Sequence, residues 1–207
     1  MTDQATHWDA VYRAKVAGQL SWFRPHLEVS IELLELAGLS ATSRVIDVGA
    51  GASTLVDDLL SRGVQSIVAV DLSVAALQAA RDRLGERSAK VRWIVSDVTT
   101  LDLPPSSVDI WHDRAALHFL TNAADAAAYV RVASDAIAGD GYAVIGGFAS
   151  DGPEQCSGLP VVRRDPSQIA QLFGDHFTMI EARRETHTTP RGAAQRFAYA
   201  LLRRHAR

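Results

Sequence analysis

Cysteine is almost absent from this chain of 207 residues, since Cys156 is the only one. An internal disulfide and a cysteine-rich zinc site are therefore excluded. No apolar run approaches the ~20 residues that a membrane-spanning helix needs, and residues 1–7 show no charged-then-apolar signal pattern. We therefore expect a cytoplasmic protein without a membrane partner.

Basic residues are not in excess either, because 21 Lys and Arg stand against 24 Asp and Glu, for a formal net charge of −3. A dedicated nucleic-acid binder usually carries a basic excess, so we expect no nucleic-acid partner. We expect no metal, because His176, His187 and His205 show no metal-ligand spacing. Without repeats or linkers, residues 1–207 are expected to form a single domain, whose oligomeric state no pattern predicts.

Short β-branched apolar runs alternate with helical patterns through residues 44–150. Each run is about as long as one strand, and several are apolar nearly throughout, as in parallel strands covered on both faces. Residues 73–84 and 122–138 carry an N-capping residue and an apolar stripe at helical spacing. This alternation predicts a parallel α/β sheet. The expected strands are residues 44–48, 66–70, 91–95, 107–111 and 142–146.

The remaining segments have a different character. Residues 177–180 and 196–202 are strand-like with no helical pattern between them, which predicts an antiparallel hairpin at one edge of the sheet. Residues 1–25 and about 150–165 are irregular, and loops of this length in compact domains are often functional. We expect residues 1–25 to form a lid-like segment and residues 151–207 to supply an acceptor-side loop and the hairpin.

The first expected strand runs into a glycine-rich turn, Asp47-Val-Gly-Ala-Gly-Ala-Ser-Thr. Gly49 and Gly51 permit close approach of a ligand to the backbone, and the following helix offers unpaired N–H groups. Asp71 ends the second strand, about 20 residues further on, where Rossmann-like folds place an acid on ribose hydroxyls. A dinucleotide fingerprint would need glycine where Thr54 stands, which counts against NAD and FAD.

A third acid, Asp97, follows the third expected strand. Each acid alone could be a solvated loop residue, but three acids at successive strand ends favour a ligand site. Residues 44–150 resemble class I S-adenosylmethionine-dependent methyltransferases in four motifs. These are the acid-x-Gly-x-Gly turn, the acid after strand two, the Asp-Val pair after strand three and a strand-four motif. Ser53 departs from the more usual glycine. The resemblance implies a Rossmann-like, seven-stranded, mostly parallel sheet with an antiparallel C-terminal hairpin and helices on both faces.

The resemblance also implies S-adenosyl-L-methionine as the cofactor. Asp71 would hold both ribose hydroxyls, Asp97 would accept from the adenine amino group, and Asp47 would act from just behind the turn. Nearby carboxylates without a clamping Arg or Lys suit a cofactor that carries a sulfonium cation and an amino-acid zwitterion. The other implied contacts are Gly49, Ala50 and Gly51 around the methionine moiety, and Leu72 and Val98 at the adenine ring.

On the acceptor side, His112, Asp113 and Arg114 follow the apolar run 107–111, which places them at the ligand-bearing edge. His112 and His118 are candidate bases because imidazole titrates near neutrality, although a lone histidine is often a packing residue. Asp113 is a third catalytic candidate, or it pairs with Arg114 and serves only the fold. The segment Asp113-Arg-Ala-Ala-Leu resembles the thiopurine methyltransferase group, and a related Asp-Lys-Gly stretch occurs in small protein-lysine methyltransferases.

The N-terminal stretches His7-Trp-Asp-Ala-Val-Tyr and Ser21-Trp-Phe-Arg-Pro resemble the same two groups, in which an aromatic-rich segment folds over the cofactor. Trp22 is the candidate cofactor contact, since aromatic faces attract a sulfonium cation; alternatively Trp8, Tyr12 and Trp22 are core residues. The sequence thus predicts methyl transfer to a small-molecule nucleophile, with a thiol or similar soft acceptor slightly favoured. A protein-lysine methyltransferase and a non-catalytic cofactor-binding module are the alternatives.

Overall fold

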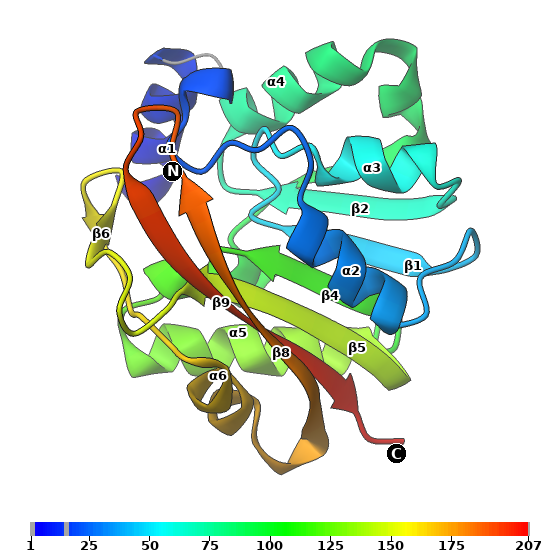
Figure 1. Ribbon diagram of the computed structural model, residues 1–207. Helices are drawn as coiled ribbons and strands as arrows, with labels where there is room; N and C mark the ends of the chain where they lie inside the picture. Colours follow the sequence, from blue (N-terminus) through cyan, green and yellow to red (C-terminus); the bar gives the residue numbers. More distant parts are fainter. Residues whose placement is uncertain (1–2, 15–16, 207) are drawn as a thin grey trace.

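The computed structural model describes residues 3–14 and 17–206 of the chain. Its main feature is a seven-stranded sheet with the strand order β3-β2-β1-β4-β5-β9-β8 (Figure 1). The first five of these strands pair in parallel, and β9 pairs antiparallel with both β5 and β8. This confirms the predicted mostly parallel sheet with an antiparallel C-terminal hairpin. The strands are β1 (Arg44–Val48), β2 (Ser66–Asp71), β3 (Val91–Val95), β4 (Val108–Arg114), β5 (Ile137–Phe148), β8 (Phe177–Thr188) and β9 (Ala194–Arg204), with a separate short hairpin of β6 (Gln155–Cys156) and β7 (Leu159–Pro160).

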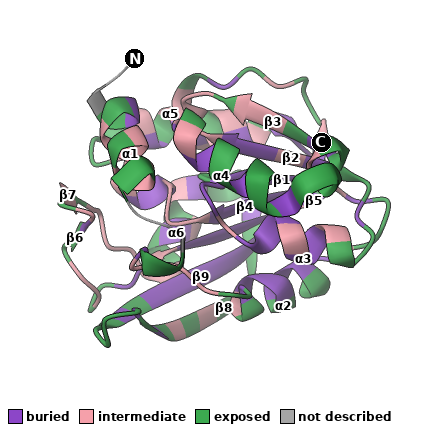
Figure 2. Cartoon of the chain, turned by 90° about the horizontal axis from the view of Figure 1, so that it is seen from above, coloured by how far each residue is buried: buried purple, intermediate pink, exposed green. Residues whose placement is uncertain are grey.

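Helices cover both faces of the sheet, each over its own apolar cluster. Because side chains alternate along a strand, Val45 packs with the helices on one face and Ile46 with those on the other. Figure 2 shows buried strands between helices whose outer surfaces are exposed. The first face carries α2 (Glu28–Leu36), α3 (Leu55–Ser61) and α4 (Val74–Leu84). The second face carries α5 (Ala123–Ala136) and α6 (Pro166–Phe173). The short 3-10 turns are η1 (Ala17–Gln19), η2 (Gly85–Lys90), η3 (Val98–Thr100), η4 (Leu117–Phe119) and η5 (Gly174–His176).

The helix expected over residues 73–84 is α4, and its capping residues account for both ends. The Ser73 Oγ accepts a hydrogen bond from the backbone N–H of Ala76 at 3.0 Å, which satisfies one of the free donors of the first turn. Gly85 ends the helix with a φ of 57°, which glycine adopts without strain. This helix confirms the prediction at both boundaries.

Several strand boundaries differ from the prediction. β8 and β9 extend well beyond the expected residues 177–180 and 196–202, because the two strands pair along nearly their whole length. β4 continues to Arg114 instead of ending at residue 111, because residues 110–114 keep their parallel pairing with β5. β5 begins at Ile137, and the turn expected at residues 139–141 is a bulge inside this strand. Asp140 takes a positive φ of 64° at the bulge, so the chain bends there without leaving the sheet.

Two helices occupy stretches for which no helix is predicted. Helix α1 (Asp3–Ala14) lies within the segment 1–25, of which residues 1–2 and 15–16 are outside the described part. Helix α6 begins with Pro166, and the backbone N–H of Asp165 donates to Gln168 Oε1 at 2.8 Å, both of which are ordinary helix-start signals. Within residues 3–14 and 17–206, no helix is long and apolar enough to cross a membrane.

Candidate active site

A cavity opens at the carboxyl ends of β1 to β4, beside the N-terminal part of the chain. Its empty volume is about 1260 Å³ with the open mouth included. Helix α1 and residues 20–27 line one side, and the β6–β7 hairpin contributes Cys156. Open α/β sheets bind their ligands at this edge, so the cavity lies where the predicted cofactor residues were expected to meet.

The glycine turn after β1 packs so tightly that both glycines are required. Gly49 and Gly51 have positive φ angles of 64° and 52°. A Cβ on Gly49 would lie 2.6 Å from the Cβ of Ala116, and a Cβ on Gly51 would overlap the hydroxyl of Tyr12. The turn is therefore held between the loop after β4 and helix α1. Gly49 lines the cavity, whereas Gly51 lies beneath Tyr12 and outside the lining.

Asp71 joins this turn to the end of β2. Its Oδ2 accepts the backbone N–H of Gly51 at 2.8 Å, and its Oδ1 accepts the backbone N–H of Ser73 at 2.8 Å. Burial, with smaller contributions from the nearby carboxylates of Asp47 and Asp9, raises the pKa of Asp71 to about 6. Each carboxylate oxygen has a second lone pair, so Asp71, which lines the cavity, can still accept from ligand hydroxyls.

Asp97 is placed at the end of β3 by the turn that it caps. Its Oδ1 accepts the backbone N–H of Thr99 at 2.8 Å and the hydroxyl of the same residue at 2.7 Å. Asp97 lines the cavity together with the predicted adenine contacts Leu72 and Val98. Apart from Gly51, all the predicted cofactor residues therefore line the same cavity. Besides Leu72, Asp97 and Val98, they are Asp47, Gly49, Ala50, Asp71 and Trp22.

The two histidines predicted as bases are both buried and both line the cavity, but only His112 has its ring nitrogens paired. Its Nδ1 lies 2.7 Å from the Oδ1 of Asp47, and its Nε2 lies 2.9 Å from the Oγ of Ser30 on α2. The His112 side chain is 1% exposed. Because both ring nitrogens are occupied, none is left to take a proton from an acceptor. These contacts do not suit the predicted role of His112 as a base.

Asp113 points away from the cavity, because it follows His112 on a strand whose side chains alternate between faces. Its carboxylate accepts the backbone N–H groups of Ala116 at 2.7 Å and Leu117 at 3.0 Å, and the hydroxyl of Tyr129 at 2.7 Å. Burial raises the pKa of Asp113 to about 6. It is not among the described residues that line the cavity, and its contacts support the loop after β4. Asp113 thus lies at the carboxyl end of β4 as predicted, but its side chain is not placed for the catalytic role.

His118 lines the cavity with both ring nitrogens free. It is 3% exposed, and neither nitrogen has a hydrogen-bond partner within the described residues. Burial and the nearby cations of Arg164 and Arg114 lower the pKa of His118 to about 3. The ring is therefore neutral near pH 7 and offers one N–H donor and one acceptor nitrogen. Of the three catalytic candidates, His118 alone combines free nitrogens with a place in the cavity.

Arg114 is a cavity residue for which we predicted no role beyond a possible pairing with Asp113. That pairing does not form, because Arg114 donates through Nε to the Tyr199 hydroxyl at 3.0 Å and through Nη1 to the Trp22 carbonyl at 3.1 Å. Its Nη2 is buried without a hydrogen bond in residues 3–14 and 17–206, and lies 4.0 Å from Glu185 Oε2. A free buried N–H of this kind favours an acceptor group on a ligand.

Aromatic side chains close the N-terminal side of the cavity. The ring centroid of Trp8 lies 5.8 Å from that of Trp22 and 5.0 Å from that of Phe119. All three residues line the cavity. Helix α1 is anchored by Asp9, whose Oδ1 accepts the Ser73 hydroxyl at 2.6 Å and a backbone N–H at the start of α4 at 3.1 Å. The predicted contact Trp22 lies in the lining, and the lid-like role of residues 1–25 stays a prediction.

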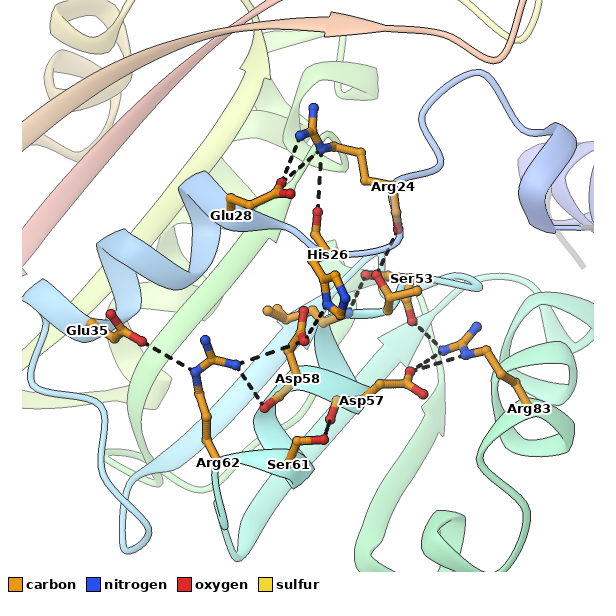
Figure 3. A network of polar contacts seen from close by, with 12 residues as sticks. Arg24, His26, Glu28, Glu35, Ser53, Asp57, Asp58, Ser61, Arg62 and Arg83 are labelled. Atoms are coloured by element: carbon orange, nitrogen blue, oxygen red, sulfur yellow. Dashed lines mark hydrogen bonds and ion pairs between the residues drawn. The ribbon is translucent and has the colours of Figure 1, made fainter.

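A polar network that includes lining residues of the cavity fixes the position of the glycine turn (Figure 3). Arg83 of α4 donates to the carbonyls of Ala52 at 2.8 Å and Ser53 at 2.6 Å, and also pairs with Asp57 of α3 at 2.7 Å. On the other side, the hydroxyl of Thr54 donates to the carbonyl of Arg24 at 2.9 Å. The turn is therefore tied to α4 and to the segment that precedes α2.

The fold, the glycine turn and the three strand-end acids define a class I, S-adenosylmethionine-dependent methyltransferase domain. Residues 45–141, slightly less than half of the chain, match the family model described as "Methyltransferase domain".

Curated relatives match over about half of the chain or less. An eEF1A lysine and N-terminal methyltransferase of Mus musculus is 24% identical over 113 residues, which are 55% of this chain and 16% of the relative. An uncharacterized methyltransferase of Mycobacterium tuberculosis is 34% identical over 79 residues, 38% of this chain and 39% of the relative. The chain thus spans only a small part of the mouse protein.

A solved structure matches nearly the whole fold. It is the 1,6-didemethyltoxoflavin-N1-methyltransferase of Burkholderia thailandensis, solved with 1,6-didemethyltoxoflavin and S-adenosylhomocysteine. The TM-score is 0.73 at 22% identity, and the match covers 98% of this chain and 89% of that one.

Proposed function

We propose that this chain transfers the methyl group of S-adenosylmethionine to a small-molecule nucleophile. The observation that carries the proposal is the division of charge along the cavity. Its carboxylates, Asp47, Asp71 and Asp97, lie at the ends of β1, β2 and β3. From β4 onward, the described lining residues include Arg114 and His118 but no carboxylate. A cationic donor suits the first end, and a neutral or anionic acceptor suits the second.

The residues at the first end fit the cofactor. Asp71 and Asp97 would hold the ribose hydroxyls and the adenine amino group, with Leu72 and Val98 beside the ring. The Oδ2 of Asp47 is buried without a hydrogen-bond partner in the described chain, and an unpaired buried carboxylate oxygen favours a cation such as the ammonium group of the amino-acid moiety. When bound, the cofactor supplies an electrophilic methyl group on a sulfonium cation.

The chain's own contribution to methyl transfer is alignment and exclusion of water. The aromatic side chains of Trp8, Trp22 and Phe119 cover the cavity from one side. Cys156, with a buried thiol whose pKa burial raises to about 11, lines the other side as a neutral group. This free thiol also fits the reduced, cytoplasmic location that we predict.

His118 and Arg114 would contact the acceptor. Because burial and neighbouring arginines lower its pKa to about 3, His118 acts through hydrogen bonds and does not take up a second proton near pH 7. The acceptor must therefore lose its proton readily or carry none. A thiol, with an unperturbed pKa of ~8.5, meets this requirement far better than a lysine at ~10.4. The free Nη2 of Arg114 would favour the anionic form of such an acceptor.

A protein-lysine methyltransferase is the second candidate, and the similarity to the eEF1A lysine and N-terminal methyltransferase favours it. Incubation of the purified chain with methyl-labelled S-adenosylmethionine distinguishes the two. One reaction would contain a panel of small thiols, phenols and heterocyclic amines, and the other a cell lysate. Labelled small molecules that disappear with the variant Asp71→Ala support our proposal. A labelled protein band without small products supports the alternative, and cofactor binding without any product indicates a non-catalytic module.

A further inference from the structure

Three buried polar side chains from different elements form one hydrogen-bonded row beneath the cavity. Asp47 of β1 and His112 of β4 are direct neighbours in the parallel register, so their side chains lie on the same face of the sheet. Helix α2 covers that face and places Ser30 against the free side of the imidazole. Ser30 and His112 are each 1% exposed, and Asp47 is 2% exposed.

The hydrogen bonds of the row join both ring nitrogens of His112 to its neighbours. Nδ1 lies 2.7 Å from Asp47 Oδ1, which as a carboxylate oxygen can only accept, so the Nδ1–H donates to it. Nε2 lies 2.9 Å from the Oγ of Ser30, a hydroxyl that can donate or accept. The one atom of the row that has no partner among the described residues is the Oδ2 of Asp47, and Asp47 lines the cavity.

Burying such a row is costly for a protein that needs only a packed core. The surrounding face consists of apolar residues such as Val45, Ile110 and Leu34, which would pack without any desolvation penalty. Asp47 and His112 both line the cavity, and the Oδ2 of Asp47 is the one atom of the row without a partner in the described chain. A polar row of this kind is suited to holding that oxygen in place. Ser30 itself is not part of the cavity lining, so its effect on a ligand must pass through His112.

We propose that Ser30 and His112 are positioning residues that fix the rotation of the Asp47 carboxylate, so that its Oδ2 is presented to the ammonium group of the cofactor's amino-acid moiety. This inference rests on the proposed function, since it assumes that the cofactor occupies the cavity. It assigns to His112 a role different from the base predicted from the sequence, and it adds Ser30, which no sequence motif indicated.

The test compares two ligands that differ in the amino-acid moiety. S-adenosylhomocysteine carries the ammonium group, whereas 5′-methylthioadenosine has the same adenosine and thioether but no ammonium or carboxylate. Calorimetric titration would be made with the wild type, Ser30→Ala, His112→Gln and Ser30→Thr. Ser43→Ala is the matched control, because Ser43, like Ser30, is a buried, hydrogen-bonded serine outside the cavity lining, but its partner is Ser40 and not His112.

The proposal predicts that Ser30→Ala weakens S-adenosylhomocysteine binding about 3–10-fold, the equivalent of one ordinary hydrogen bond. His112→Gln should weaken it about 10–100-fold, as expected when a hydrogen bond to a charged group is lost. Binding of 5′-methylthioadenosine should change less than about twofold in both. Ser30→Thr, which keeps the hydroxyl, should restore most of the affinity, and Ser43→Ala should bind both ligands as the wild type does.

Equal weakening of both ligands in Ser30→Ala would show a purely structural role and would overturn the proposal, as would unchanged binding of both. Thermal melts of Ser30→Ala and Ser30→Thr show whether the variants are folded, and the mild threonine change keeps the test decisive if Ser30→Ala is unstable. Failure of the proposed function is a separate result. In that case the wild type would bind neither ligand, or would bind S-adenosylhomocysteine while methylating no acceptor.

Discussion

Replacement of Asp113 by alanine separates a structural role of this carboxylate from the catalytic role that its position in the sequence suggested. The substitution leaves three buried donors, two backbone N–H groups and the Tyr129 hydroxyl, without their acceptor. Each unsatisfied donor costs ~1–3 kcal/mol. Burial raises the pKa of Asp113 to about 6, which means that keeping this carboxylate ionised costs the folded state ~3 kcal/mol. The substitution removes this cost and so offsets part of the loss. The expected net loss of stability is about 3 kcal/mol.

Urea unfolding followed by circular dichroism would measure this loss. The exposed Asp82→Ala in α4 is the control, since it should change the free energy of unfolding by less than about 0.5 kcal/mol. Asp113→Ala should bind S-adenosylhomocysteine with unchanged affinity under conditions where it is folded, because Asp113 does not line the cavity. A variant that is as stable as the wild type but has lost turnover by orders of magnitude would refute the structural assignment.

The same carboxylate makes a pH-dependent contribution whose sign follows from its surroundings. The pKa of Asp113 is raised by burial to about 6 in the folded chain, against ~3.9 when unfolded. Between these values the folded state binds more protons than the unfolded state, so this group's contribution to stability falls as the pH rises from about 4 to about 6. Asp113→Asn cannot titrate. The difference in unfolding free energy between wild type and Asp113→Asn should therefore shift in this direction over that interval, and a flat difference would contradict the reasoning.

Three further changes test other parts of the site. Gly49→Ala forces a positive φ of 64° on an alanine and places its Cβ 2.6 Å from that of Ala116, so cofactor binding should weaken at least tenfold in calorimetry; wild-type affinity would show that the turn can relax. Arg83→Met removes the donors to the carbonyls of Ala52 and Ser53. It should weaken cofactor binding about 3–10-fold and lower the melting temperature less than Asp113→Ala does. His118→Ala should lower turnover and raise the acceptor KM while leaving cofactor affinity unchanged, and equal kinetics with an active acceptor would remove this histidine from the site.

The cofactor side of the site could be predicted from sequence because it depends on local patterns. Gly49 follows an apolar strand, and Asp71 and Asp97 end the next two strands. The carboxyl ends of parallel strands meet at one edge of the sheet, so three local patterns are enough to predict one site. Asp71 and Asp97 line the cavity together as a result.

The acceptor side could not be predicted in the same way, because it depends on where β4 ends and on distant packing. Once β4 is seen to continue to Arg114, alternation sends the side chains of His112 and Asp113 to opposite faces, and the two cannot share a site. Arg114 is held by Tyr199 of β9 and lies near Glu185 of β8, contacts that exist only after the C-terminal hairpin has added to the sheet. No periodicity in the sequence encodes these pairings.

The N-terminal segment shows a similar limit. Its aromatic residues indicated a covering role, yet the helix α1 was not predicted. Asp9 becomes informative only when it is seen to accept hydrogen bonds at the start of α4. Start signals for α6, in contrast, are present in the sequence at Pro166 and Gln168, and a closer reading of capping patterns would have found that helix.

Calorimetric titration of S-adenosylhomocysteine into the wild type and into Asp71→Ala tests the central claim most directly, namely that the donor binds between the glycine turn and the strand-end acids. The account predicts one binding site per chain, and a loss of about 10–100-fold or more in Asp71→Ala, because hydrogen bonds to a charged carboxylate are removed. Absence of binding to the wild type, or equal affinity in the two proteins, would contradict it.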